Sequence, residues 1–240
     1  MNSILEIKNA TKKFGGLIAN DNITFSVQEG EIVGLVGPNG AGKTTLFNSV
    51  SGAHSLTSGQ VVFNGEDITK KKPYEICKLG VGRTFQIPQS LNEMSVFENV
   101  LVAALNRHGS ISVAKEHTQK VIAMCGLASF IYMHAGNLNV MQKKRLEIAR
   151  ALATEPKLLL LDETMAGLSG VERKEAINLI QRIKISGITI LMIEHVMEVV
   201  MNVSDRVVVL TSGRLLAEGT PEEVTQNQQV INAYLGGMTN

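Results

Sequence analysis

The chain is poor in cysteine and in aromatic residues. Its 240 residues include two cysteines, no tryptophan, three tyrosines and seven phenylalanines. Cys77 and Cys125 are far apart in sequence and form no CxxC or Cys/His group. Because two cysteines are not a disulfide framework, we expect no disulfide between them. We expect both to behave as small buried hydrophobic residues in a reducing compartment.

The sequence also lacks a surplus of one charge and a long apolar run. The net charge is +1, so no basic excess indicates a nucleic-acid partner. The short run Lys70-Lys71-Lys72 is typical of a solvated loop. Apolar runs such as Leu158 to Leu161 are far shorter than the roughly 20 residues of a membrane helix. If the protein acts at a membrane, a partner must therefore hold it there.

Local patterns predict an α/β fold with two kinds of β-structure. Ile4 to Lys8 and Asn22 to Val27 alternate apolar and polar residues, which predicts antiparallel strands. From Leu146 onward, helical patterns alternate with apolar runs, which predicts a largely parallel sheet with helices on both faces. Further strands are expected at Ile32 to Val36, Gln60 to Phe63, Leu158 to Leu161, Ile188 to Ile193, Val207 to Leu210 and Leu215 to Glu218, and helices at Leu46 to Val50, Glu172 to Ile185, Pro221 to Thr225 and Val230 to Leu235.

The length suits one large domain that carries a subdomain. Between Ser95 and Ser129 the apolar residues recur at helical spacing, as in Val96 and Val100. We therefore predict a single domain over 1–240, with a helical subdomain at approximately 87–145. The remaining parts, approximately 1–86 and 146–240, are expected to form the core with an antiparallel β layer.

A glycine-rich segment, Gly37 to Thr44, fits the pattern GxxxxGK[ST] of a phosphate-binding loop. It follows an apolar strand and opens a helix, which is the context that such a loop requires. Glycines let the backbone wind around an anion with its N–H groups inward, and the helix N-terminus favours negative charge. Lys43 can reach the β- and γ-phosphates, and the Thr44 hydroxyl can bind Mg²⁺. The residues expected to contact nucleotide are Gly37, Asn39, Gly40, Ala41, Gly42, Lys43, Thr44 and Thr45.

Two acidic residues, Asp162 and Glu163, follow the apolar run that begins at Leu158. Ligands of α/β sheets bind where parallel strands end. Asp162 is therefore a candidate for holding Mg²⁺ through water, and Glu163 for orienting or deprotonating an attacking water. The alternative is a strand followed by a solvated acidic turn.

Taken in order, these motifs resemble the ATPases of ABC transporters over essentially the whole chain. The resemblance implies ATP and Mg²⁺ as cofactors and three further site residues. Gln86, in Arg83-Thr84-Phe85-Gln86, matches the glutamine that senses Mg²⁺. His195 matches the histidine that contacts the γ-phosphate, and Phe14 matches the aromatic residue that stacks on adenine. The loop from Ala166 to Ser169 matches one that crosses a dimer interface.

Within that family, the chain resembles the branched-chain amino-acid uptake type. The likeness lies in Phe14 to Ala19, Met94 to Val100, Leu146 to Leu152 and the tail Glu218 to Val224. This implies transmembrane permease subunits as partners, a solute-binding protein that acts indirectly, and no nucleic acid. It also implies a cytoplasmic protein bound peripherally to the inner face of the membrane. Because the cassette does not touch the solute, the substrate is inferred by analogy.

The chain departs from the family at its LSGGQ motif, which caps the ATP bound by the partner ATPase. The matching stretch is Leu138-Asn139-Val140-Met141-Gln142, so serine and both glycines are replaced. A methionine at the second glycine obstructs close approach to the γ-phosphate and could penalise the backbone. Loss of one such donor costs about 10²–10³ in rate at comparable sites. Asn139 can still donate a side-chain hydrogen bond.

This departure favours a heterodimer with a second ABC ATPase that carries an intact motif, over a homodimer with two impaired sites. The leading function is a transport ATPase. A nucleotide-gated subunit with weak catalysis and a non-transport ABC ATPase acting on DNA or ribosomes are the alternatives. The last is disfavoured because the chain has no basic surplus, no long coiled coil and no second ATPase half.

Overall fold

A computed structural model describes residues 2–235. These residues form two compact units, which are described separately. The first unit contains residues up to 76 and from 189 onward, and the second contains Cys77–Ile188. The predicted helical subdomain at 87–145 lies inside the second unit, and its boundaries remain a prediction.

The elements of the first unit are β1 Ser3–Phe14, β2 Leu17–Gln28, β3 Ile32–Val36, α1 Lys43–Val50, β4 Ser58–Phe63, β5 Glu66–Asp67, β8 Thr189–Ile193, α7 Met197–Val203, β9 Arg206–Thr211, β10 Arg214–Gly219, α8 Pro221–Gln226 and α9 Gln228–Leu235. The helix α2, Pro73–Leu79, spans the junction. The second unit contains β6 Val81–Arg83, α3 Val96–Ala104, α4 Ile111–Met124, α5 Val140–Leu152, β7 Leu158–Asp162, α6 Gly170–Ile185 and two 3₁₀ turns, Ala128–Phe130 and Ala135–Asn137.

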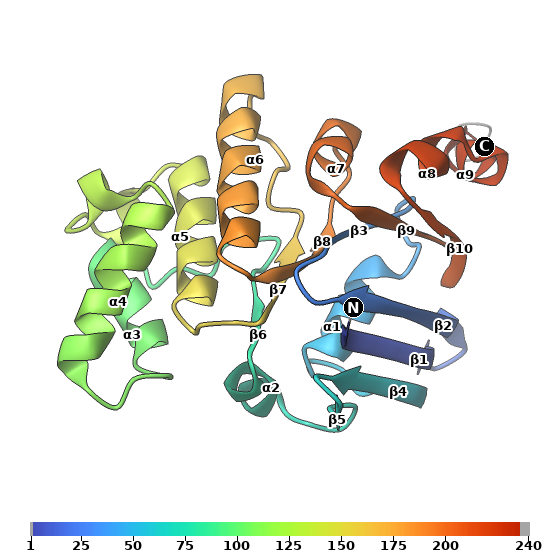
Figure 1. The fold of residues 1–240 in the computed structure, drawn as a ribbon, viewed down its shortest axis with the longest axis horizontal. Helices are drawn as coiled ribbons and strands as arrows, with labels where there is room; N and C mark the ends of the chain where they lie inside the picture. Colours follow the sequence, from blue (N-terminus) through green and yellow to red (C-terminus); the bar gives the residue numbers. More distant parts are fainter. Residues whose placement is uncertain (1, 236–240) are drawn as a thin grey trace. The chain divides into compact units, whose positions relative to one another are not determined.

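The first unit contains the predicted antiparallel layer, in the order β2-β1-β4-β5 (Figure 1). Leu5 lies opposite Val27 on one side and Phe63 on the other, and all three side chains are buried. In β2 the buried residues Ile23, Phe25 and Val27 alternate with more exposed neighbours, as the sequence pattern predicted. β1 and β2 are 12 residues each and longer than expected, because register shifts let the strands continue past their first apolar stretch.

A second group of strands in the same unit is mostly parallel. β3 lies between β8 and β9 and is parallel to both, while β10 is antiparallel to β9. Every residue of β3 and β8 is buried, as expected for parallel strands covered on both faces. Leu35 pairs with Ile193, so the carboxyl ends of β3 and β8 lie at the same edge. The α/β class predicted from the sequence is thereby confirmed.

In the second unit, β6 and β7 pair in parallel, with Arg83 opposite Leu160. The segment between 87 and 145 contains helices and turns but no strand. The helix α3 packs on both α4 and α5 through residues at helical spacing. The buried residues of this contact include Val96, Val100 and Ala104 on α3, Ala114, Val121 and Ile122 on α4, and Leu146 and Ala149 on α5.

Among the described helices and strands, four short ones, α2, α7, β5 and β6, were not predicted; β5 has only two residues. The helices α2 and α7 have seven residues each, too few for a clear periodicity, and β6 has only three with a glycine in the middle. Both cysteines are free. Cys125 is buried, and burial raises the pKa of its thiol to about 12. Cys77 is only half-buried, so the expectation of burial was wrong for that residue, which lies near the end of α2.

Among residues 2–235, no helix combines the length and the apolar character needed to cross a bilayer. The longest described helix is α6 with 16 residues.

Candidate nucleotide-binding site

The predicted phosphate loop connects β3 to α1 within the first unit. The buried strand ends at Val36, and the helix begins at Lys43 with Gly42 as its N-cap. No side chain caps the N-terminus of α1 at Gly42, so the first backbone N–H groups of the helix remain available to an anion. Asn39, Gly40 and Thr44 are exposed and therefore accessible to a ligand.

Two glycines of the loop are required by close packing. Gly42 has a φ of 94°, and a Cβ there would lie 2.3 Å from the Ala19 carbonyl oxygen. Gly37 has a φ of 149°, and a Cβ there would lie 2.1 Å from the Leu210 carbonyl oxygen. The Asn20 side chain reinforces the turn by donating a hydrogen bond to the Gly42 carbonyl at 3.0 Å. The loop is therefore shaped by neighbouring strands of its own unit before any ligand binds.

The side chain of Lys43 folds back over the loop. Its ammonium group donates to the Gly37 carbonyl at 2.7 Å and to the Pro38 carbonyl at 3.0 Å, and the residue is 5% exposed. Backbone carbonyls hold the positive charge inside the loop, at the position where phosphate oxygens would compete for it. The residues present therefore fit a nucleotide polyphosphate.

His195 lies near the same edge of the first unit. It follows β8 by two residues, and β8 ends beside β3, from which the phosphate loop starts. The preceding residue, Glu194, is 2% exposed, whereas His195 is exposed. The pairing of β3 with β8 thus places His195 and the phosphate loop at the carboxyl ends of two neighbouring strands, which is where ligands of parallel sheets bind.

Phe14, the predicted adenine platform, ends β1 and is 44% exposed. Its ring contacts His54 edge to face, with 5.6 Å between centroids. The Lys12 ammonium lies 4.8 Å from the ring centroid and donates to the Ser55 carbonyl at 2.7 Å. These contacts orient the ring and leave part of it open to solvent, which is compatible with stacking on a base.

The acidic residues occupy the end of β7 in the second unit. Asp162 is 2% exposed, and its carboxylate lies 3.3 Å from the Arg83 guanidinium on the neighbouring strand β6. Burial lowers the pKa of Arg83, and the charge of Asp162 opposes that shift. No role was predicted for Arg83, because the role depends on the pairing of Arg83 with Leu160 across β6 and β7, which the sequence does not reveal.

Glu163 and Gln86 are brought together although they are 77 positions apart. The Gln86 side-chain nitrogen donates to the Glu163 carboxylate at 2.6 Å. Glu163 also has a φ of 49°, which is uncommon outside glycine and asparagine and frequent at functional sites. Donation through nitrogen leaves the Gln86 oxygen available to a metal ion. The oxygens of Gln86 and Asp162, both in the second unit, are hard ligands of the kind that Mg²⁺ prefers, so these two side chains fit the ion.

The stretch that replaces LSGGQ begins α5. Asn139 is its N-cap: its side-chain oxygen accepts from the Gln142 N–H at 2.8 Å, and the Gln142 side chain accepts from the Asn139 N–H at 2.9 Å. Leu138 is buried, whereas Val140 is 65% exposed. Val140 and Met141 have no positive φ. The substitutions therefore suit this backbone, and the expected backbone penalty is not seen in this conformation.

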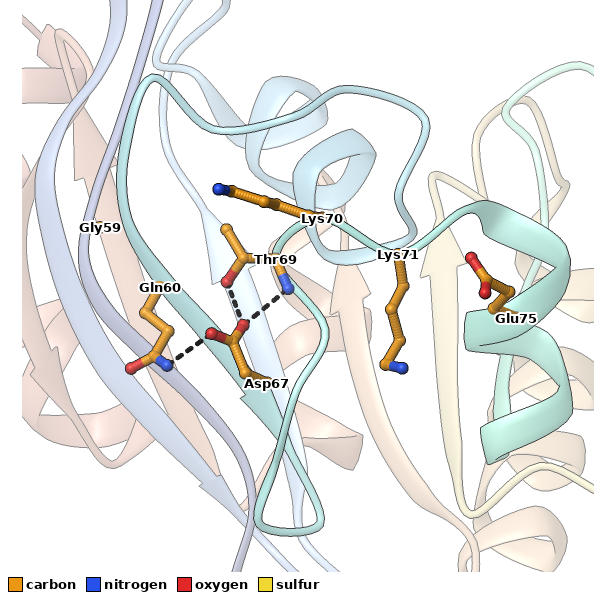
Figure 2. A pocket seen from close by; sticks show the side chains of 7 residues that line it. All are labelled: Gly59, Gln60, Asp67, Thr69, Lys70, Lys71 and Glu75. Carbon is orange, nitrogen blue, oxygen red and sulfur yellow. Dashed lines mark hydrogen bonds between the residues drawn. The ribbon is translucent and has the colours of Figure 1, made fainter.

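Lys70 and Lys71 of the basic run line a surface pocket together with residues of β4, β5 and α2 (Figure 2). The Lys71 ammonium pairs with Glu66 at 2.8 Å. Asp67 accepts from the Thr69 hydroxyl and from Gln60, which lowers the pKa of its carboxyl. The lysine and acidic side chains neutralise one another locally, which agrees with a solvated loop.

A phosphate loop between a buried parallel strand and a helix, with an acidic strand end in the same chain, defines the class of P-loop ATPases. Residues 20–166 match the family model described as ABC transporter. Residues 214–238 match the model described as branched-chain amino acid ATP-binding cassette transporter. The chain therefore belongs to the ABC transporter family, and it is an ATPase of the ABC type.

Known relatives and solved structures agree with this assignment. The high-affinity branched-chain amino acid transport ATP-binding protein BraF of Pseudomonas aeruginosa is 39% identical, over 97% of this chain and 98% of the relative. A nucleotide-free ATP-binding cassette from an ABC transporter superposes with a TM-score of 0.89 at 34% identity, over 97% of this chain and 99% of the other. A dimeric post-hydrolysis cassette with ADP and Pi gives a TM-score of 0.81 at 25% identity, over 90% and 98%.

Proposed function

We propose that the chain powers the import of branched-chain or related amino acids as the ATP-hydrolysing subunit of an ABC transporter. The observation that carries the proposal is the match of residues 214–238 to the branched-chain model. The name of the Pseudomonas relative supports the same substrate class. The substrate would be selected by the solute-binding protein and the permease subunits, which this chain drives from the inner face of the membrane.

Within the site, we assign roles to residues that the sequence singled out. Lys43 and the N–H groups of the loop bind the β- and γ-phosphates, and Phe14 stacks on adenine. His195 contacts the γ-phosphate. The oxygens of Thr44, Gln86 and, through water, Asp162 would hold Mg²⁺, which would neutralise phosphate charge. The remaining nucleotide contacts are Gly37, Asn39, Gly40, Ala41, Gly42 and Thr45.

Glu163 is assigned to orient or deprotonate the attacking water. Its hydrogen bond with Gln86 supports this role, because the amide holds the carboxylate in one orientation. When Gln86 turns its oxygen toward the ion, its nitrogen can keep this contact. Binding of the ion and orientation of the base are thereby coupled through one side chain.

We propose a heterodimer with a second ABC ATPase. In this arrangement the Leu138-Asn139-Val140-Met141-Gln142 stretch faces the ATP on the partner's phosphate loop. Two observations support a weakened motif: the side-chain oxygen of Asn139 is engaged in capping α5, and half-buried Met141 stands where a glycine is expected. ATP on this chain's own loop would face the partner's intact motif and be hydrolysed normally.

Transport can be tested with the complex that copurifies with the chain from its native membrane. In proteoliposomes with solute-binding protein, we expect ATP-dependent uptake of radiolabelled leucine, isoleucine and valine. Lys43→Ala should abolish it, while exposed Lys8→Ala should not. Uptake of a different solute that still requires Lys43 would overturn the substrate assignment and leave the ATPase assignment intact.

The heterodimer predicts unequal sites. Glu163→Gln should remove most ATP hydrolysis, while the corresponding change in the partner ATPase should remove little. Equal losses from the two changes, or a complex with two copies of this chain, would contradict the asymmetry.

A second candidate, a nucleotide-gated subunit with weak catalysis, is favoured by the same replacement of both glycines. ATP turnover of the wild-type complex distinguishes this candidate from the transport ATPase. A weakly catalytic subunit predicts slow turnover even with the partner present.

A further inference from the structure

Two histidines and a glutamate to which no role has been assigned meet in the second unit. His108 follows α3, His117 lies on α4, and Glu155 follows α5. One ligand atom from each lies within 4.8 Å of the other two. The Glu155 Oε1 atom lies 3.6 Å from His108 Nε2 and 3.8 Å from His117 Nδ1. The two rings are 5.0 Å apart, with an interplanar angle of 62°.

The backbone holds this cluster in place. The His108 N–H donates to the Ala104 carbonyl at 3.2 Å and so continues α3 by one turn. The neighbouring Arg107 donates to the Thr154 carbonyl at 2.6 Å, which ties the loop after α3 to the turn after α5. Glu155 has a φ of 49° and donates its N–H to the Leu152 carbonyl at 2.9 Å. Three separate segments thus present their side chains to one point without a ligand.

The hydrogen bonds of the described residues leave one nitrogen of each imidazole unaccounted for. His117 does form a hydrogen bond with the Leu152 backbone. The Nε2 atoms of both His108 and His117 are buried and have no hydrogen-bond partner among residues 2–235. The side chains are 16% and 21% exposed, so water reaches them poorly. Buried polar atoms are nearly always partnered, and an unpartnered one indicates a missing water or ion. The Glu155 carboxylate is 49% exposed and gives a route from solvent.

We propose that His108, His117 and Glu155 bind a divalent transition-metal ion, with Zn²⁺ as the best match. Two imidazoles and one carboxylate are a common zinc donor set, with metal–ligand distances of about 2.0–2.2 Å. A tetrahedral ion with such bonds separates its ligand atoms by about 3.3–3.5 Å. The Glu155–His108 separation of 3.6 Å is close to this range, and the ligand atoms of all three residues lie within 4.8 Å of one another. Side-chain rotations, chiefly of the His117 ring, would bring the three atoms to one ion. Imidazole nitrogens disfavour Mg²⁺ and Ca²⁺, which prefer oxygen.

The ion would act as a cross-link inside the second unit. It would join the loop after α3, the helix α4 and the turn that leads into β7 (Figure 1). Because β7 ends at Asp162, the anchored turn lies at the opposite end of that strand from the acidic residues. An ion that binds only the folded chain stabilises it by mass action. We therefore expect an effect on the stability of this unit, independent of the transport function proposed above.

The test is titration of the purified, nucleotide-free full chain with ZnCl₂, by calorimetry and by thermal unfolding. We expect one Zn²⁺ per chain and a rise in Tm that MgCl₂ does not produce. His117→Gln and Glu155→Gln should each weaken Zn²⁺ binding by at least about tenfold and remove the rise in Tm. Glu116→Gln, an exposed change one residue from His117, is the matched control and should behave as wild type. Cys77→Ser should also bind normally.

Co²⁺ provides a second readout, since tetrahedral coordination gives a characteristic visible absorption. Wild type should show this band and His117→Gln should lose it. Glu155→Asp keeps a carboxylate and should retain the absorption band. This variant tests the site if the glutamine variants fail to fold. Absence of Zn²⁺ binding at micromolar concentration would overturn the proposal. So would binding that survives the ligand changes or disappears only in Cys77→Ser, since the ion would then lie elsewhere.

Discussion

At the scale of single residues, the shape of the phosphate loop depends on a glycine that packs against a backbone carbonyl of a neighbouring strand. Gly42 adjoins Lys43, and its α-hydrogen faces the Ala19 carbonyl, where a methyl group would lie at 2.3 Å. Gly16 is the contrasting case, because a Cβ there meets no atom within 4 Å and its φ is not positive. The two glycines therefore serve different purposes although both lie in motifs that resemble the family.

We expect Gly42→Ala to lower the free energy of unfolding by more than about 1 kcal/mol, because the methyl group clashes and the left-handed backbone is strained. Nucleotide binding should weaken as the loop shifts. Chemical denaturation and binding of a fluorescent ATP analogue measure the two effects. Gly16→Ala is the control and should change stability by less than about 0.5 kcal/mol. Equal behaviour of the two variants would show that the contact with Ala19 does not constrain the loop.

The role of Arg83 could not be predicted from the residues around it in the sequence. Its guanidinium lies within 3.3 Å of Asp162, in a pair whose side chains are 11% and 3% exposed. The motif that contains Arg83 was recognised from the sequence, but its role depends on β6 and β7 being neighbours. A strand of three residues gives no pattern from which that pairing could be predicted.

At the scale of elements, the described helices use one recurring device. The helices α3, α5, α6 and α8 each begin with a capping box, in which the N-cap side chain and the third helical residue bond reciprocally. The third residue is Glu98, Glu172 and Glu223 in three of them and Gln142 in α5. Hydrogen bonds from the N-cap backbone lower the pKa of each of the three glutamates.

These caps predict an acid dependence of stability. Because the folded-state pKa of each glutamate is below its unfolded value of about 4.3, the caps contribute fully above that pH. The contribution is lost as the pH falls through the lower folded-state values. We expect Glu98→Gln/Glu172→Gln/Glu223→Gln to flatten the fall in unfolding free energy between about pH 5 and pH 3, since glutamine keeps the box without titrating. Urea denaturation across this range is the measurement. An unchanged slope in the triple variant would show that other carboxyl groups dominate.

Element boundaries were predictable where the signal was local and long. The strand from Ile32 to Val36 was predicted with its observed bounds because four apolar side chains around Gly34 are flanked by turn signals. The helix α7, with seven residues, was missed because it is shorter than two turns of periodic pattern and has no side-chain cap. Long buried helices and strands can be predicted from their own sequence pattern. Short ones form because they pack on neighbouring elements, which the local sequence does not reveal.

At the scale of the whole molecule, the replaced motif sets the activity expected of the purified chain. α5 accommodates Val140 and Met141 with helical backbone, so a glycine there is not needed for folding. The effect of Met141 must therefore appear in the dimer. We expect turnover of the chain alone to be low, because each site of a homodimer would lack one close backbone donor.

If the chain forms homodimers, Met141→Gly should raise ATP turnover by about 10- to 10³-fold, since a glycine restores close approach to the γ-phosphate. Steady-state phosphate release measures this, with binding of an ATP analogue as the control for folding. Nearly inactive wild type and variant that both bind ATP would indicate that a different partner completes the site. Loss of ATP binding in the variant would contradict the account of Met141.

The sequence by itself determined the phosphate loop, the acidic strand end and the α/β class, because each depends on residues consecutive in the chain. It also determined the family, through the order of those motifs. Tertiary structure decided which distant residues meet. Gln86 reaches Glu163 across 77 positions, and Gly42 is constrained by Ala19 on another strand. His108, His117 and Glu155 form a cluster that no spacing rule describes. Such contacts follow from strand pairing and helix packing, whose partners a linear pattern does not identify.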